Sequence, residues 1–225
     1  MKKLASTLPN MILSLGIITV LSGLLLGVMY TVTKAPIEQS EREMQTAALA
    51  EVLPPFDNDP EAEAQSVNVG GQVYEIYPAR MDGHSVGVAV KGVTMDGFSG
   101  EVVIICGFDN KGTVVNYRVL KQAETPGLGA KMEMWFRDPS GTRSVIGKSP
   151  GIQNFSPVKD GGDVDAITAA TISSRAFLSV LRGAYEAYRQ YAQTQGMYIP
   201  AVSDSHTGAS TQQPTDCHIG SSVHS

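Results

Sequence analysis

Residues 100–121 read GEVVIICGFDNKGTVVNYRVLK, and this stretch predicts two antiparallel strands joined by a short turn. Runs rich in β-branched residues lie on both sides of Asn110-Lys111-Gly112, which is the pattern of a β-hairpin. Residues 72–78 and 85–92 are shorter runs of the same kind. We therefore expect four or more antiparallel strands between Gln72 and Lys121.

Apolar residues downstream of these strands follow a helical period instead. Between about Thr168 and Gln193 they recur every four residues, which is the spacing of one face of a helix. Residues 132–138 are compatible with a short helix, and residues 144–155 with an irregular or strand-like return. Strands followed by a long amphipathic helix predict an α+β fold with an antiparallel sheet and packed helices. The recurring residues of the long helix are Ile172, Ala176, Val180, Ala184 and Tyr188.

The N-terminal part of the chain predicts a membrane anchor. Residues 11–32, MILSLGIITVLSGLLLGVMYTV, contain no charged side chain, and roughly 20 apolar residues cross the hydrocarbon core of a bilayer as a helix. A cleaved signal peptide has a shorter apolar region and a small-residue cleavage site, which the following TKAPIEQSE does not offer. We expect one uncleaved span. The very short segment before it favours a cytoplasmic amino terminus and a domain outside the cytoplasm.

The chain divides into four predicted segments. Residues 1–35 form the anchor, and residues 36–70 form a helical linker whose helix begins at Pro36 and ends before Pro54-Pro55. Residues 71–200 form one domain. Residues 201–225 are polar and rich in serine, threonine and glutamine, which is typical of disorder.

Composition and motifs exclude several classes of function. The formal net charge is −5 and no basic stripe is present, so nucleic acid is not expected as a partner. The chain contains no GxxxxGK[ST], HExxH or GxSxG motif and no strand–GxGxxG–helix pattern. Cys106 and Cys217 lie far apart and predict no disulfide. Three of the four histidines lie in the polar tail at spacings that fit no ligand pattern, so no metal site is predicted.

Two segments rich in glycine and hydroxyl residues remain as candidate sites: ETPGLG, residues 124–129, and DAITAATISS, residues 165–174. Both have a structural interpretation, because ETPGLG could be a turn and Asp165 or Thr168 could cap a helix. DAITAATISS also has a functional one, since free N–H groups and the dipole at a helix N-terminus bind phosphate. The residue types alone leave both interpretations open.

In the functional interpretation, the hydroxyl of Thr171 lies in the first turn of the helix and could be esterified by a phosphate. Arg175 follows four residues later and is therefore expected on the same helix face. The small residues Ala169 and Ala170 would leave room for a bulky group.

DAITAAT resembles the covalent flavinylation motif Asp-x-x-Ser/Thr-Gly/Ala-Ala-Thr of FMN-binding domains. Such domains occur in the G subunit of the Rnf ion-translocating ferredoxin:NAD oxidoreductase and in the C subunit of the sodium-translocating NADH:quinone reductase. ETPGLG and DAITAAT, in this order behind one membrane span, carry the resemblance, which covers most of the chain. The length and the motif spacing are more similar to the Rnf subunit.

The resemblance implies a covalent FMN whose phosphate is esterified to Thr171. It implies a separate flavin transferase that uses FAD as donor and recognises the acidic position matched by Asp165. It also implies that the ETPGLG loop lines the isoalloxazine ring, with Thr125 and Leu128 as the favoured direct contacts. The candidate loop residues are Glu124, Thr125, Gly127, Leu128 and Gly129, and further candidate neighbours of the flavin or phosphate are Lys159, Thr168, Ala170 and Arg175.

The sequence departs from the family pattern at two positions. The family often has histidine two residues before the loop glutamate, where this chain has Gln122, which argues against a proton-linked role at that position. The family commonly has glycine at the third position from the end of the attachment motif, where this chain has Ala169. Neither departure removes the acceptor hydroxyl.

The resemblance therefore predicts a membrane-anchored flavoprotein that carries electrons rather than a catalyst acting alone. Its implied partners are the other subunits of an Rnf-type complex, the flavin transferase and the bacterial inner membrane, with the FMN domain on the periplasmic side. Two alternatives stay open: a stand-alone extracytoplasmic flavin carrier, and a non-redox binding module at the cell surface.

Overall fold

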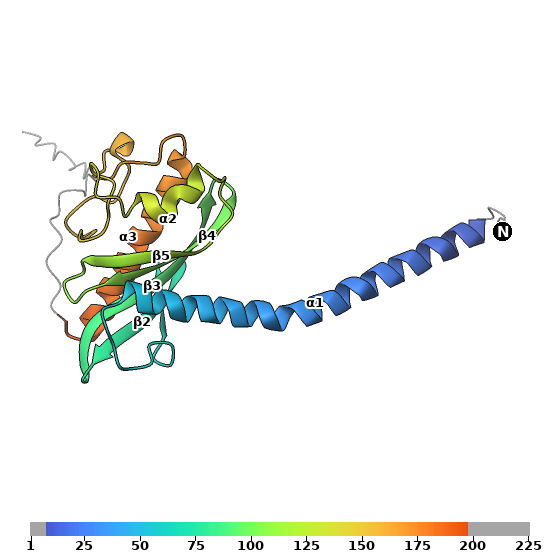
Figure 1. The fold of residues 1–225 in the computed structure, drawn as a ribbon, viewed down its shortest axis with the longest axis horizontal. Coiled ribbons are helices and arrows are strands. Elements are labelled where there is room, and N and C mark those ends of the chain that lie inside the picture. The colour runs from blue at the N-terminus through green and yellow to red at the C-terminus, as the bar shows by residue number, and fades with distance from the viewer. Residues whose placement is uncertain (1–7, 198–225) are drawn as a thin grey trace, which may run out of the picture.

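The computed structural model describes residues 8–197, in which a long N-terminal helix joins a five-stranded antiparallel sheet (Figure 1). Each strand pairs with its neighbour in the sequence, so the sheet is a meander. The predicted strands after Gln72 and the α+β class are confirmed, and β1 is an additional strand. The strands are β1 (Gln65–Val69), β2 (Gln72–Met81), β3 (His84–Gly97), β4 (Gly100–Phe108) and β5 (Val114–Gln122).

Helix α1 (Leu8–Val52) is continuous and contains Pro36 in its interior. The prediction that a second helix begins at Pro36 is therefore wrong. Proline costs a helix one backbone hydrogen bond and bends it, and the helix-forming segments on both sides continue through that position, with the curvature visible in Figure 1. The N-terminal part of α1 is long and apolar enough to cross a membrane, with a mean hydropathy of 2.4.

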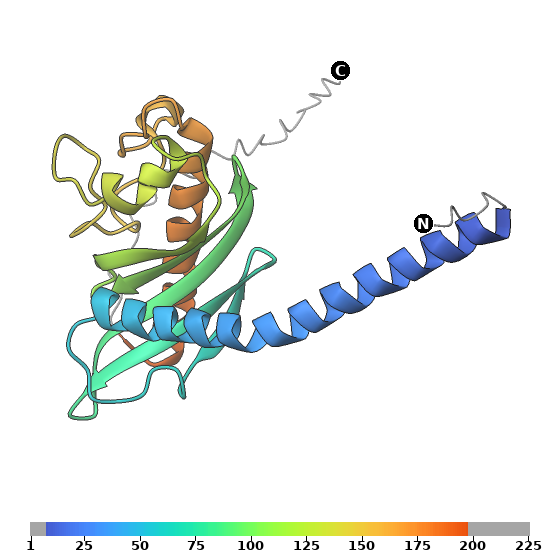
Figure 2. The same ribbon diagram turned by 45° about the vertical axis from the view of Figure 1, so that its right-hand side comes forward.

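The two faces of the sheet bury different partners (Figure 2). Helix α3 (Thr171–Thr194) packs on one face, where side chains such as Ile104 of β4 lie in the main hydrophobic core. The last turn of α1 packs on the other face, where Ile105, the next residue of β4, lies in a second core. This division follows from strand geometry, because successive side chains point to opposite faces.

Only the C-terminal part of the linker helix, residues 36–52, is buried by the second core. Ala48 and Val52 are buried against the sheet, whereas Ile37 and Met44 are about half exposed, at 50% and 46%. The linker helix therefore contacts the domain only through its last turns.

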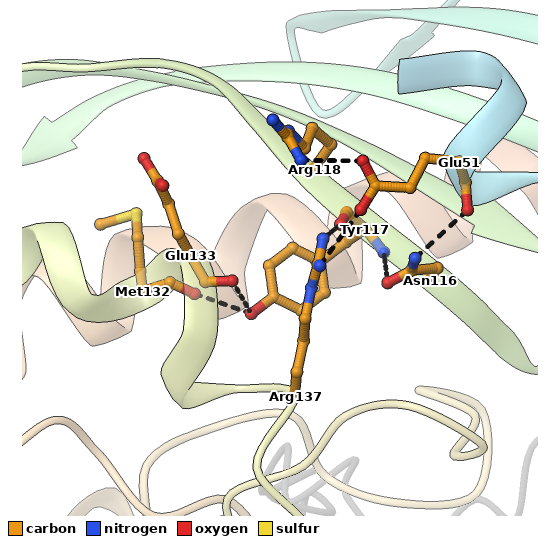
Figure 3. Close-up of polar contacts among 7 residues, drawn as sticks. All are labelled: Glu51, Asn116, Tyr117, Arg118, Met132, Glu133 and Arg137. Carbon is orange, nitrogen blue, oxygen red and sulfur yellow. Dashed lines mark hydrogen bonds and ion pairs between the residues drawn. The ribbon is translucent and has the colours of Figure 1, made fainter. Parts of the chain in front are cut away.

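Polar contacts reinforce this attachment (Figure 3). The carboxylate of Glu51 accepts hydrogen bonds from Arg118 at 2.8 Å and from Arg137 at 3.1 Å. The Arg137 guanidinium also donates to the carbonyl of Tyr117, and the Tyr117 hydroxyl donates to the carbonyl of Met132 at 2.7 Å. Burial raises the pKa of this hydroxyl. The end of the anchor is thus joined to β5 and to the helical segment after it.

Irregular segments connect β5 to α3. They include the 3₁₀ turn η1 (Gly129–Lys131), the short helix α2 (Met132–Trp135) that the sequence predicted, and the 3₁₀ turn η2 (Val158–Asp160). Helix α3 begins at Thr171, three residues after its predicted start near Thr168. The reason is the backbone of Ala169, whose φ of 62° is left-handed and cannot belong to a right-handed helix. The predicted tail, residues 201–225, lies outside the described residues.

The contact between α1 and the sheet predicts that Gly107→Ala destabilises the domain. A Cβ at Gly107 would lie 1.9 Å from the carbonyl oxygen of Val52, so the anchor helix would have to move away from β4. Overpacking of this kind costs about 1–3 kcal/mol. Thermal unfolding of the detergent-solubilised protein, followed by circular dichroism, would show a lower midpoint. An unchanged midpoint would contradict this close packing.

The backbone at Ala169 predicts that Ala169→Gly stabilises the protein. A left-handed conformation costs a residue with a Cβ about 1–2 kcal/mol, whereas glycine adopts it freely. The greater freedom of glycine in the unfolded chain offsets part of this gain, so we expect a net increase of roughly 0.5–1 kcal/mol. The matched control is Ala166→Gly in the same loop, where φ is not positive and glycine should destabilise. Denaturant titrations of the two variants should give opposite signs.

Candidate functional site

A cavity of about 310 Å³ opens where three segments distant in sequence meet. The turn between β3 and β4 forms one wall, the loop after β5 forms the second, and the N-terminus of α3 forms the third. The cavity is lined by Phe98, Glu124, Thr125, Leu128, Gly129, Ala169, Ala170, Thr171, Ile172 and Ser173. Both candidate segments, ETPGLG and DAITAATISS, therefore contribute to a single site.

The α3 wall is an uncapped helix N-terminus. The N-cap residue Ala170 has no side-chain acceptor, and no side chain among the described residues 8–197 caps the helix. The first backbone bond of the helix is donated by Ser174 to Ala170, so Thr171, Ile172 and Ser173 precede it. These three residues line the cavity, and their N–H groups have no partner within the helix. Free N–H groups and the positive end of the helix dipole favour an anion there.

The hydroxyl groups near this helix end are not equivalent. Ser173 donates to the carboxylate of Glu124 at 2.8 Å, and Ser174 donates to the carbonyl of Ala170 at 2.9 Å. Thr168 is exposed and does not line the cavity. Thr171 lines the cavity and is partly exposed, and within residues 8–197 no hydrogen bond to its hydroxyl is found.

The remaining walls combine a compact loop with apolar side chains. The N–H groups of Leu128 and Ala130 both donate to the carbonyl of Thr125, which closes the loop on itself. Leu128 is 40% exposed and Phe98 is 67% exposed, so both present apolar surface at the cavity. The two chemical parts of FMN fit this site. The apolar walls suit the planar ring, and the uncapped helix end suits the phosphate.

Several predicted site residues lie outside the cavity lining: Gly127, Lys159, Asp165, Thr168 and Arg175. Asp165 instead supports the neighbouring loops, because its carbonyl accepts a hydrogen bond from the Trp135 indole at 2.9 Å. Its carboxylate accepts a longer bond from the N–H of Thr142 at 3.3 Å.

Arg175 faces a second, adjacent cavity of about 470 Å³. There it donates two hydrogen bonds to Asp160, both 2.7 Å long, and these bonds lower the pKa of the Asp160 carboxyl. Although Arg175 follows Thr171 by four residues, its guanidinium does not line the first cavity. It is held instead by Asp160 of η2.

Phe98, Ile172 and Ser173 line the cavity, although the sequence analysis did not select them. Phe98 lies in the turn between β3 and β4, and a large aromatic residue within DGFSG is the signal that could have identified it. Ser173 is buried, so it is recognisable only from its contact with Glu124.

Comparisons with known proteins identify the family of this domain. Residues 97–186 match the family described as the FMN-binding domain. This range extends from the turn that carries Phe98 through both candidate segments and most of α3, so it contains every residue that lines the first cavity.

The chain is also similar to curated proteins that are named as the G subunit of an ion-translocating oxidoreductase complex. It is 33% identical over 180 residues to the protein of Photorhabdus laumondii, covering 76% of this chain and 85% of the relative. It is 31% identical over 179 residues to that of Vibrio cholerae, covering 75% and 84%. It is 36% identical over 168 residues to that of Erwinia tasmaniensis, covering 70% and 79%. The chain therefore belongs to the family of G subunits of ion-translocating oxidoreductase complexes and contains an FMN-binding domain.

Proposed function

We propose that this protein is the membrane-anchored FMN subunit of an ion-translocating oxidoreductase complex and that it transfers electrons within that complex. The family membership supports the complex and the cofactor, and α1 supplies the single membrane span. Bound flavin supplies the redox chemistry. The side chains of the protein bind it, orient it and limit its contact with water. By resemblance, the complex couples ferredoxin oxidation and NAD reduction to ion transport.

We further propose that FMN is joined to the protein through a phosphoester at Thr171. The observation that carries this proposal is the hydroxyl of Thr171, which lines the cavity at the start of α3. Within residues 8–197 neither this hydroxyl nor the N–H groups of the first helical turn have a hydrogen-bond partner. The bond forms between Thr171 Oγ1 and the FMN phosphorus of FAD. The bond from that phosphorus to AMP breaks, and the hydroxyl proton leaves with the AMP. A separate flavin transferase performs the step, and Asp165 belongs to the segment that it recognises.

The walls of the cavity divide the work between two parts of the cofactor. The N-terminus of α3 would hold the phosphate, because its N–H groups donate to anions. The loop from Glu124 to Gly129 and the turn that carries Phe98 would enclose the ring. Arg175 and Lys159 lie outside this cavity and would act on the phosphate only at longer range.

Replacing the acceptor hydroxyl tests the attachment. With the flavin transferase co-expressed, we expect the wild-type band to keep flavin fluorescence after denaturing electrophoresis and Thr171→Ala to lose it completely. The matched control is Thr194→Ala, which removes a hydroxyl at the other end of α3, outside both the motif and the cavity, and should keep the fluorescence. Fluorescence retained in Thr171→Ala would contradict the attachment, and a dark wild type would favour a non-redox binding module.

The proposed orientation places the FMN domain on the periplasmic side, where lost FMN could not readily be replaced. Protease added to intact spheroplasts should therefore digest the domain and remove the covalently bound fluorescence, while a cytoplasmic marker survives. In inverted membrane vesicles the domain should be protected. The opposite pattern would place the flavin in the cytoplasm.

A further inference from the structure

Glu124 joins the three walls of the flavin cavity. It is buried, with 5% of its surface exposed. Its Oε2 accepts a hydrogen bond from the Ser173 hydroxyl of α3 at 2.8 Å, and its Oε1 accepts one from the Ser99 N–H in the β3–β4 turn at 3.3 Å. Its own N–H donates to the Gln122 side chain at 2.7 Å. One carboxylate thus connects the turn beside Phe98, the loop and the first turn of α3.

Two glycines leave the space that this carboxylate fills. A Cβ on Gly97 would lie 2.7 Å from Oε1, and a Cβ on Gly129 would lie 2.5 Å from Oε2 and 2.5 Å from the Ser173 hydroxyl. Side chains at these positions would displace the carboxylate from its partners. The local backbone is therefore closely fitted around a buried acidic group at the cavity wall.

Among residues 8–197 this carboxylate has no cationic partner. None of the ion pairs found among the described residues includes Glu124, and its hydrogen bonds come from neutral donors. Both oxygens accept hydrogen bonds, so the carboxylate is held between two different walls of the cavity. A buried charge without a counter-ion acts strongly on a neighbouring charge, because protein screens it less than water does.

Resting on the proposed function, we propose that Glu124 is a positioning residue that lowers the reduction potential of the bound flavin. Two electrons from a reduced redox protein and one proton from water convert the oxidised ring into a reduced ring that carries one negative charge. The fixed negative charge of Glu124 disfavours that added charge. The hydrogen bonds to Ser99 and Ser173 hold the carboxylate in the wall, so it acts through its charge and without bonding the flavin.

The test is the midpoint potential of the covalently loaded protein, measured by spectroelectrochemical titration. Glu124→Gln keeps the size of the side chain and removes its charge. In the fraction of Glu124→Gln that carries FMN, we expect a positive shift that corresponds to at least a tenfold change in the reduction equilibrium, which is about 30 mV for a two-electron couple. The matched control is Glu133→Gln, which removes an exposed carboxylate that does not line the cavity and should leave the potential unchanged.

A potential of loaded Glu124→Gln equal to that of the wild type would overturn the proposal. If Glu124→Gln does not load FMN, Ser173→Ala decides. It removes one of the two donors that hold the carboxylate in the wall, so the charge should act less on the ring and the potential should shift in the positive direction. No shift or a negative shift would overturn the proposal. A wild type without flavin would refute the proposed function instead, so the two failures are distinguishable.

Discussion

The alternation of side chains along β4 is the constraint on which the rest of the structure depends. Ile104 and Ile105 are both buried but point to opposite faces of the sheet, so both faces need a cover. Helix α3 covers one face with a long amphipathic surface. The other face is covered by the last turn of the membrane anchor, so the anchor is part of the folded domain as well as its attachment to the bilayer.

This arrangement also positions the site. Because α3 lies on the sheet, its N-terminus is held beside the end of β5 and the β3–β4 turn, and the ETPGLG loop lies between them. The stacking of Phe136 on Phe177, with ring centroids 4.3 Å apart, joins the segment after α2 to the same helix. The cavity is therefore formed by segments whose positions the core already fixes. A rigid scaffold of this kind suits a carrier whose flavin must keep a constant environment.

The sequence predicted the elements better than their contacts. Strong local patterns revealed β2 to β5, the membrane span and α3. QSVNV, which forms the edge strand β1, is short and mostly polar, so its pairing with β2 decides its structure. The unbroken course of α1 through Pro36 depends on the strong helical segments on both sides. Which residues line the cavity depends on tertiary packing, which local sequence patterns do not show. Phe98 lies 26 residues before Glu124 in the sequence but lines the same cavity, and Arg175 pairs with Asp160 outside it.

The missing cap of α3 is best understood as a property of the site. A serine or aspartate at an N-cap position stabilises a helix by about 1 kcal/mol, and Ala170 forgoes this stabilisation. A capping oxygen at that position would bond the first N–H groups of the helix, and a carboxylate there would also repel a phosphate. Ala169 adds a left-handed backbone that costs further stability. Such local costs are expected at functional sites. In the proposed function they separate two tasks, because the helix end would hold the phosphate while the buried carboxylate of Glu124 would act on the ring.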